Sequence, residues 1–251
     1  MLELKNVAFG YGGRYVIGGV SLAVRPGESC ALMGKNGCGK TTLVRLMGRQ
    51  LMPDGGEIVL DGRGYASFSS REFARRVSVF PQSRPLPDMT VGEYVAYGRY
   101  PYAGLSFRLT DGDRRAVDAA FELTGTARFA DRPLAELSGG ERQLVYLAMQ
   151  LAQDSEYMIL DEPCASLDAA NTFAITDVLA AAAGSGKAVL AIMHDIPHAL
   201  RCFDRVLLMD GGRIVYDGTA AGAVDSGGIE AVFGVNCLRV DGGDYIIRKK
   251  I

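Results

Sequence analysis

One stretch constrains the fold of this 251-residue chain more than any other: "ALMGKNGCGKTTLVRLMG", residues 31–48. An apolar run meets three glycines, then a lysine, two threonines and a helical pattern. The spacing Gly34-x-x-x-x-Gly39-Lys40-Thr41 is that of a phosphate-binding P-loop, placed between a predicted strand and a predicted helix. Glycines let backbone N–H groups turn toward an anion, and the N-terminus of the next helix adds a favourable dipole. The stretch therefore predicts a nucleotide site on an α/β sheet.

Two side chains of this loop have an expected task. We expect Lys40 to reach the β- and γ-phosphates and the Thr41 hydroxyl to bind Mg²⁺. The predicted nucleotide contacts of the segment are Gly34, Lys35, Asn36, Gly37, Cys38, Gly39, Lys40, Thr41 and Thr42. The alternative is a glycine-rich turn at a helix start, which has no need of this full spacing. The loop alone leaves GTPases, small-molecule kinases and many ATPases open.

Composition narrows the class of protein. The net charge is −2, which gives no electrostatic reason to expect a nucleic-acid partner. Five cysteines without a C-x-x-C pair indicate reduced thiols in a cytosolic compartment. The longest apolar stretch, 178–193, is interrupted by "GSGK" and is too short to span a bilayer. If the protein serves a membrane process, another chain must span the membrane.

Hydrophobic periodicity predicts strands that are interrupted by a helical block. Alternating or short apolar runs indicate strands at 2–9, 16–24, 28–33, 56–62, 77–80, 157–160, 187–193 and 205–210. The last of these joins "RIVYDG" through Gly211-Gly212, which is a hairpin signal. Helical patterns follow Lys40 and fill a block at roughly 86–152. The chain is therefore expected to be α/β, with a mostly helical insertion.

A second acidic motif follows a buried strand. "YMILDEP" ends in Asp161-Glu162, and an acid at a strand end beside a P-loop suits a partner of Mg²⁺. Glu162 is placed to polarise the water that attacks the γ-phosphate. The alternative is an ordinary surface strand end.

The stretch "LSGGERQ", 137–143, decides between the remaining classes. A Ser-Gly-Gly at a helix start again offers N–H groups and a hydroxyl to an anion. One subunit hardly needs two such cradles for one nucleotide, so two copies placed head to tail are the economical solution. Here the sequence resembles the ATP-binding subunits of ABC transporters, over nearly the whole chain. The resemblance implies one domain, 1–251: a P-loop NTPase (RecA-like) core, an N-terminal antiparallel β subdomain and an inserted helical subdomain at about 86–152.

The resemblance also implies roles for other residues. Tyr11 is similar to the aromatic residue that stacks on adenine, although a core or edge-strand tyrosine is the alternative. Gln82, in "VFPQ", is similar to the glutamine that meets Mg²⁺ and the attacking water. His194, in "AIMHD", is similar to the switch histidine of the γ-phosphate. The remaining implied nucleotide contacts are Ser138, Gly139 and Gly140 of the signature motif and Asp168 of the D-loop.

A finer pattern indicates the branch of the family. The "TV-x-E-x-V-x-x-GR-x-P" stretch resembles ATPases of importers for iron-siderophores, haem and cobalamin. The resemblance implies ATP and Mg²⁺ as cofactors, a homodimer, membrane permease subunits and an extracytoplasmic solute-binding protein reached through the permease. The chain would then lie at the cytoplasmic face of the membrane. The alternatives are a soluble ABC ATPase acting on ribosomes or nucleic acid, and an ATPase of a cytosolic assembly machine.

Two further expectations concern single side chains. Cys38 lies beside loop N–H groups, Lys40 and a helix N-terminus, so we expect a lowered thiol pKa and a reactive cysteine. The tyrosines and arginines of 84–105, Arg84 and Arg99 among them, predict a permease-docking surface. Packing within the helical subdomain is the alternative for that stretch.

Overall fold

A computed structural model describes residues 1–82, 86–103, 108–240 and 243–249 of the chain. The fold begins with an antiparallel sheet. Within the described residues this sheet has the order β2-β1-β4-β5. Its strands are β1 (Leu2–Tyr11), β2 (Arg14–Val24), β4 (Gly55–Leu60) and β5 (Arg63–Gly64). β1 pairs antiparallel with both β2 and β4, which confirms the predicted N-terminal antiparallel subdomain.

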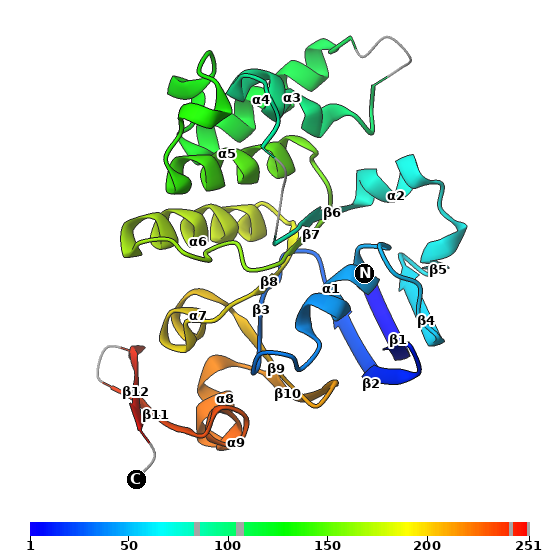
Figure 1. The fold of residues 1–251 in the computed structure, drawn as a ribbon, viewed down its shortest axis with the longest axis vertical. Coiled ribbons are helices and arrows are strands. Elements are labelled where there is room, and N and C mark those ends of the chain that lie inside the picture. The colour runs from blue at the N-terminus through cyan, green and yellow to red at the C-terminus, as the bar shows by residue number, and fades with distance from the viewer. Residues whose placement is uncertain (83–85, 104–107, 241–242, 250–251) are drawn as a thin grey trace.

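A second, mostly parallel sheet forms the centre of the molecule (Figure 1). Its order in the described residues is β10-β9-β3-β8-β7-β6, with β10 the antiparallel edge strand. The strands are β3 (Ser29–Met33), β6 (Val77–Phe80), β7 (Tyr157–Leu160), β8 (Ala188–Ile192), β9 (Arg205–Asp210) and β10 (Arg213–Gly218). Because β3, β8, β7 and β6 run parallel, their carboxyl ends meet at one edge of the sheet.

Both faces of this sheet are buried. In β3, Cys30 and Leu32 pack with the N-terminal sheet and helix α1 (Lys40–Met47), whereas Ala31 and Met33 pack with helices of the opposite face. Successive strand residues point to opposite faces, so a strand buried on both sides carries an unbroken apolar run. This is why "SCALM" shows no polar alternation.

Helices fill the stretch after β6 (Figure 1, top). They are α3 (Val91–Ala96), α4 (Asp111–Thr124) and α5 (Gly139–Ala152), with short 3-10 turns between them. Each of these helices has an N-cap residue that exchanges hydrogen bonds with an acidic residue three positions further on. The N-caps are Thr90, Thr110 and Ser138. These reciprocal capping boxes satisfy N–H groups that the first helical turn leaves unpaired. The predicted helical block is therefore present, while its limits as a subdomain stay a prediction.

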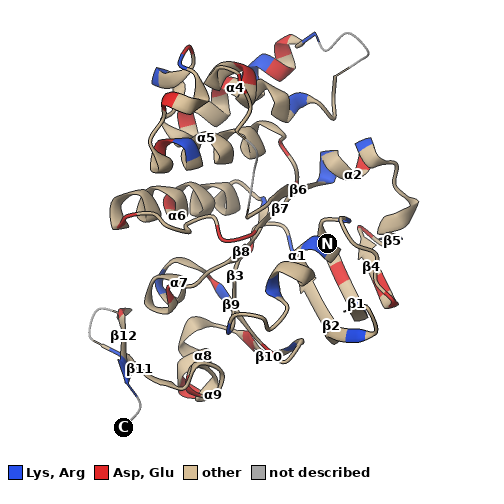
Figure 2. Ribbon diagram, in the orientation of Figure 1, with Lys and Arg blue, Asp and Glu red and all other residues tan. Residues whose placement is uncertain are grey.

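The other elements cover the sheet or extend from it. They are α2 (Ser70–Arg76), α6 (Ala169–Gly184), α7 (Ile196–Cys202), α8 (Ala220–Asp225), α9 (Gly228–Phe233), β11 (Val235–Arg239) and β12 (Tyr245–Lys249). Figure 2 shows acidic and basic residues interspersed along the chain. In the part of the chain that the structure describes, no helix is both long and apolar enough to cross a bilayer.

Every predicted strand has its counterpart within a few residues, and the Gly211-Gly212 hairpin joins β9 to β10 as expected. The sequence patterns did not predict α2, α6, α7, α8, α9 or the hairpin of β11 and β12. The α6 segment is alanine-rich and apolar around most of its surface, so it lacks the amphipathic period on which the helix predictions depended.

Candidate nucleotide-binding site

The glycine loop leaves strand β3 and enters helix α1, as the spacing predicted. Gly39 caps the helix with φ 109°, a conformation that residues with a Cβ rarely adopt. Lys40 is the first helical residue, and its Nζ donates to the carbonyl oxygens of Gly34 at 2.7 Å and Lys35 at 3.1 Å. The ammonium group is thus held over the loop whose N–H groups form the expected anion cradle.

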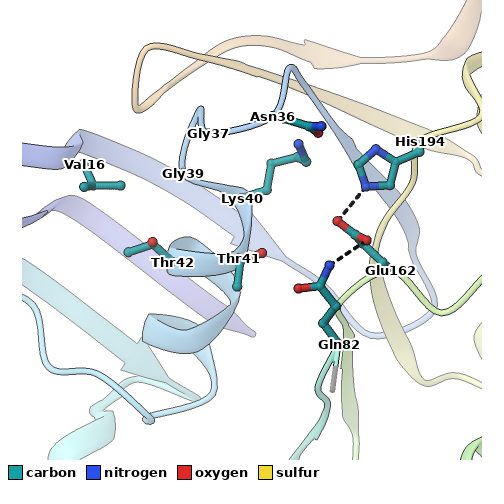
Figure 3. Close-up of a pocket in the computed structure, with 10 residues that line it drawn as sticks. All are labelled: Val16, Asn36, Gly37, Gly39, Lys40, Thr41, Thr42, Gln82, Glu162 and His194. Carbon is teal, nitrogen blue, oxygen red and sulfur yellow. Dashed lines mark hydrogen bonds and ion pairs between the residues drawn. The ribbon is translucent and has the colours of Figure 1, made fainter. Parts of the chain in front are cut away.

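A cavity of about 500 Å³ opens beside this loop. Its lining is Val16, Asn36, Gly37, Gly39, Lys40, Thr41, Thr42, Gln82, Glu162 and His194. Figure 3 shows these side chains arranged around one space, with Glu162 opposite the loop. Segments far apart in sequence meet here because Gln82, Glu162 and His194 follow the parallel strands β6, β7 and β8 at the same sheet edge.

Glu162 has partners at both carboxylate oxygens (Figure 3). Gln82 Nε2 donates to Oε2 at 2.8 Å, and His194 Nε2 lies 2.6 Å from Oε1. Burial raises the pKa of this carboxyl group, but the bonds to His194 and Gln82 outweigh burial and hold the pKa below its ordinary value. Glu162 also has φ 55°, and such left-handed non-glycine residues concentrate at functional sites. The site therefore holds an ionised acceptor, aimed by its neighbours.

Asp161 and Thr41 form the oxygen-rich side of the site. Thr41 Oγ1 donates to Asp161 Oδ1 at 3.3 Å, and Asp161 is only 4% exposed. Burial raises the pKa of Asp161, and the neighbouring charge of Glu162 adds to that effect, while the Thr41 bond opposes it. A hydroxyl and a carboxylate side by side are hard oxygen ligands that suit Mg²⁺, which takes one or two carboxylates plus phosphate oxygens. The residues present thus fit the predicted metal.

A second cavity of about 490 Å³ adjoins the first and shares Val16 and Gly37 with it. Its lining is Tyr11, Arg14, Tyr15, Val16, Gly37, Cys38, Gly211 and Gly212. Tyr11 is 47% exposed at the end of β1, so it is not a core tyrosine. No sequence motif indicated Arg14, Tyr15 and Val16, because they belong to a β-strand with no motif of its own.

The second glycine motif lies apart from this space. Within the described residues, the linings of the two cavities include none of Ser138, Gly139, Gly140 and Asp168. Ser138 and Gly139 are exposed at the start of α5, where Ser138 Oγ accepts the N–H of Glu141 at 3.3 Å. Asp168 is exposed as well and caps α6 through the N–H of Asn171. The chain therefore presents two helix-start cradles at two different places.

The expectation of a reactive Cys38 is wrong. Its side chain is only 7% exposed, and burial raises its thiol pKa despite the opposing charge of Lys40. Loss of hydration penalises the thiolate more than the nearby N–H groups and the ammonium favour it. Cys30 and Cys164 follow the same rule, because burial raises the pKa of each thiol to about 12.

The expectation that Arg99 docks a permease is also wrong. Arg99 is 7% exposed, its Nε donates to Asp113 Oδ1 at 2.9 Å, and its Nη1 donates to the carbonyl of Ala152 at 2.8 Å. Its guanidinium group also covers the ring of Tyr102. Arg84 lies outside the described residues. Arg99 therefore fastens the helical block internally, although Tyr97 and Tyr100 nearby are 51% and 58% exposed.

Comparison with known proteins identifies the class. The model of the ABC transporter family matches residues 17–165, more than half of the chain, so the chain belongs to that family. The match runs from β2 through the glycine loop, Gln82 and the Ser-Gly-Gly turn to just beyond Glu162. Members of this class bind and hydrolyse ATP, which confirms the prediction of an ATPase.

Curated relatives point to one branch of the family. The chain is 34% identical to the iron(3+)-hydroxamate import ATP-binding protein FhuC of Bacillus subtilis, covering 94% of this chain and 88% of that one. It is 35% identical to the ferric enterobactin transport ATP-binding protein FepC of Escherichia coli, covering 96% and 89%. It is 36% identical to the hemin import ATP-binding protein HmuV of Pseudomonas fluorescens, covering 95% and 94%. The predicted resemblance to this branch is confirmed.

Solved structures agree on the fold. An ATP-binding cassette of an ABC transporter superposes with a TM-score of 0.82 at 22% identity, covering 93% of this chain and 98% of that one. A dimeric cassette in a post-hydrolysis state, bound to ADP and Pi, has a TM-score of 0.75 at 25% identity, covering 88% and 99%. These matches confirm the predicted P-loop NTPase fold.

Proposed function

We propose that this chain is the ATP-hydrolysing subunit of a membrane importer for an iron-siderophore complex, haem or cobalamin. The observation that carries the proposal is full-length similarity to relatives named for ferric hydroxamate, ferric enterobactin and hemin transport. The "TV-x-E-x-V-x-x-GR-x-P" stretch supports the same branch. The permease and its extracytoplasmic solute-binding protein would select the cargo, so this chain would supply work rather than specificity.

In the proposed site the loop 34–42 wraps the phosphates of ATP and Lys40 neutralises them. Tyr11 stacks on the adenine, which its exposure beside the loop permits. Glu162 accepts a proton from, or orients, the attacking water, and its low pKa keeps it ionised for this task. Gln82 and His194 hold that carboxylate in place, and both line the space where the γ-phosphate would lie.

Thr41, Asp161 and Gln82 are the residues that would hold Mg²⁺. When bound, the ion neutralises charge on the β- and γ-phosphate oxygens. Because Asp161 is buried and its pKa is raised, a nearby cation would favour its charged form.

The Ser138–Gly140 cradle, in which Ser138 and Gly139 are exposed, is proposed to act on the nucleotide of a second copy of the chain. The Ser138 oxygen accepts a bond from its own helix, yet its hydroxyl hydrogen remains available to a phosphate oxygen. Asp168 follows the loop that, in the same dimer, would approach the partner. The proposed assembly is a homodimer with two shared ATP sites, seated peripherally on permease subunits at the cytoplasmic face of the membrane.

Two experiments together test the proposed function. Affinity-tagged chain is isolated from detergent-solubilised membranes of its own organism, and uptake of radiolabelled ferric siderophore, haem and cobalamin is compared with and without the gene. Co-isolation of a polytopic permease and loss of uptake of one cargo are the expected results. Recovery with ribosomes or a cytosolic assembly complex, with all three uptakes intact, would contradict the importer and support the soluble alternatives.

A further inference from the structure

The segment that carries Ser138 is fastened to the segment that carries Glu162. Gln143 lies in the second turn of α5, and its Nε2 donates to the carbonyl oxygen of Pro163 at 2.6 Å. Pro163 directly follows Glu162 and is buried, while Gln143 is half-buried. A hydrogen bond sheltered from water holds its two partners more firmly than an exposed one. This bond therefore ties α5 to the backbone next to Glu162.

A second contact joins α5 to the start of α6. Gly140 is buried, and a Cβ at that position would lie 2.3 Å from Asn171 Nδ2 and 2.4 Å from Asn171 Cγ. The amide of Asn171 thus lies directly against the backbone of Gly140. The backbone N–H of Asn171 in turn donates to Asp168 Oδ1 at 2.8 Å. The close approach accounts for a glycine at a helical position where alanine would otherwise be preferred.

We propose that Gln143 and Asn171 are positioning residues that couple the two ATP sites of the dimer. The inference rests on the proposed function, in which Ser138–Gly140 serve the nucleotide of the partner and Glu162 serves that of its own subunit. A phosphate that engages Ser138 shifts α5, and the two contacts carry this shift to Glu162 and Asp168. The hydrolytic carboxylate of one site thereby responds to nucleotide in the other.

The first test removes the bond between Gln143 and Pro163. Gln143→Leu keeps the volume of the side chain and deletes the donor. We expect kcat to fall by about 5- to 100-fold, the usual range of coupling between sites, and the Hill coefficient for ATP to fall toward one. ATP binding to the monomer and the melting temperature should change little. A normal Hill coefficient and a normal kcat would overturn the proposal.

The matched control lies at the other end of the same helix. Gln153 caps the C-terminus of α5, and its Nε2 donates to the carbonyl oxygen of Ala74 at 2.6 Å, so Gln153→Leu deletes the same kind of bond at the end of the helix. It does not touch the Glu162 segment, and we expect normal cooperativity. An equal loss of cooperativity in Gln153→Leu would show that general loosening of the helix, rather than coupling, is responsible.

A double-mutant cycle tests the second contact. Gly140→Ala displaces the Asn171 amide, Asn171→Ala deletes it, and Asn236→Ala in β11 is the remote control. If both changes remove one contact, the double variant should be no less active than the worse single variant. If the fold losses in kcat of the two single variants instead multiply in the double variant, the two residues act independently. Gly140 would then serve only the partner's nucleotide, and this result would overturn the role of Asn171.

The failure of the coupling is distinguishable from the failure of the proposed function. The Glu162→Gln protein is run on gel filtration with Mg-ATP to detect a dimer. Absence of any ATP-dependent dimer refutes the shared sites themselves. A dimer that forms while Gln143→Leu remains cooperative refutes only the coupling.

Discussion

The glycine loop 34–41 and the glycine turn 138–140 use one backbone chemistry, yet they differ in completeness. Both offer N–H groups at the start of a helix to an anion. The loop shares one cavity with Gln82, Glu162 and His194 of the same chain, and Asp161 lies hydrogen-bonded to Thr41. The turn at Ser138 is exposed, and it lines neither that cavity nor the adjoining one.

Under the proposed function, the loop binds nucleotide within one subunit, whereas the turn contributes to hydrolysis only in the dimer. A complete cradle with its own counter-charges can hold a nucleotide inside one subunit. Under the proposed function, the exposed Ser138 turn would act only on nucleotide that a second copy of the chain brings to it. Changes near the loop should therefore affect chemistry in every state, whereas changes at the turn should act only through assembly.

The largest effect is expected at Glu162. Glu162→Gln keeps the size of the side chain but replaces one acceptor oxygen by an NH2 group and removes the proton acceptor, so ATP hydrolysis should fall by about 10²- to 10⁴-fold while ATP binding persists. Steady-state phosphate release and nucleotide titration measure the two properties. Glu156→Gln, just before the same strand β7, should keep normal activity. Near-normal hydrolysis in Glu162→Gln would refute its role.

A large effect on stability is expected at Arg99. Arg99→Ala leaves the carboxylate of Asp113 buried without its cation, which typically costs about 3–5 kcal/mol of unfolding free energy. Chemical denaturation measures the loss. Arg132→Ala removes an exposed pair with Glu136 in the same block and should cost less than about 1 kcal/mol. Equal losses in both variants would contradict the internal role of Arg99.

The same pair predicts a pH dependence. Bonds from Thr110, and then from Arg99, lower the pKa of Asp113 from 3.8 to about 2 in the folded chain, against the effect of burial. A lowered folded-state pKa stabilises the protein above the unfolded value, and this contribution is lost as the pH falls through the folded value. The stability difference between the parent and Arg99→Ala should therefore stay constant near neutral pH and narrow from pH 3.8 toward 2. Denaturation series at several pH values check this.

A smaller but more selective effect is expected at Ser138. Ser138→Arg should lower hydrolysis by about 10²-fold, as removal of one preorganised donor does, without weakening ATP binding by the loop. In the parent, sites shared between two subunits should make the rate rise more steeply than in proportion to protein concentration, and Ser138→Arg should remove this upward curvature. Ser69→Arg replaces another exposed capping-box serine, at α2, and should retain activity. Loss of ATP affinity in Ser138→Arg would mean that the turn serves its own subunit.

The smallest effect is expected at Cys38. Because burial raises its thiol pKa, maleimide should label this cysteine slowly at pH 7 and faster as the pH rises. Mass spectrometry of the loop peptide, with unfolded protein as the reference, measures the rate. Cys38→Ser should keep ATPase activity. Rapid labelling of the folded protein at neutral pH would restore the original expectation of a reactive thiol.

Much of the site was predictable because its motifs are local. The loop 34–41 needs only a strand, eight residues and a helix, so its spacing identifies it without tertiary information. Asp161 and Glu162 follow an apolar strand in the same way. Resemblance to the family supplied Gln82 and His194, and the parallel order of β6, β7 and β8 explains why they meet Glu162.

Tertiary structure alone decided the properties that depend on burial and on contacts distant in sequence. Cys38 has favourable charged neighbours in sequence, yet desolvation in the fold raises its pKa. Arg99 lies in a stretch rich in tyrosine and arginine, which are common at interfaces, yet it pairs with Asp113 inside the helical block. The contact of Gly140 with Asn171 joins two helices through residues that lie 31 positions apart in the sequence. Short motifs determine which chemistry a segment can offer, whereas the dielectric and the neighbours around each group exist only once the chain has packed.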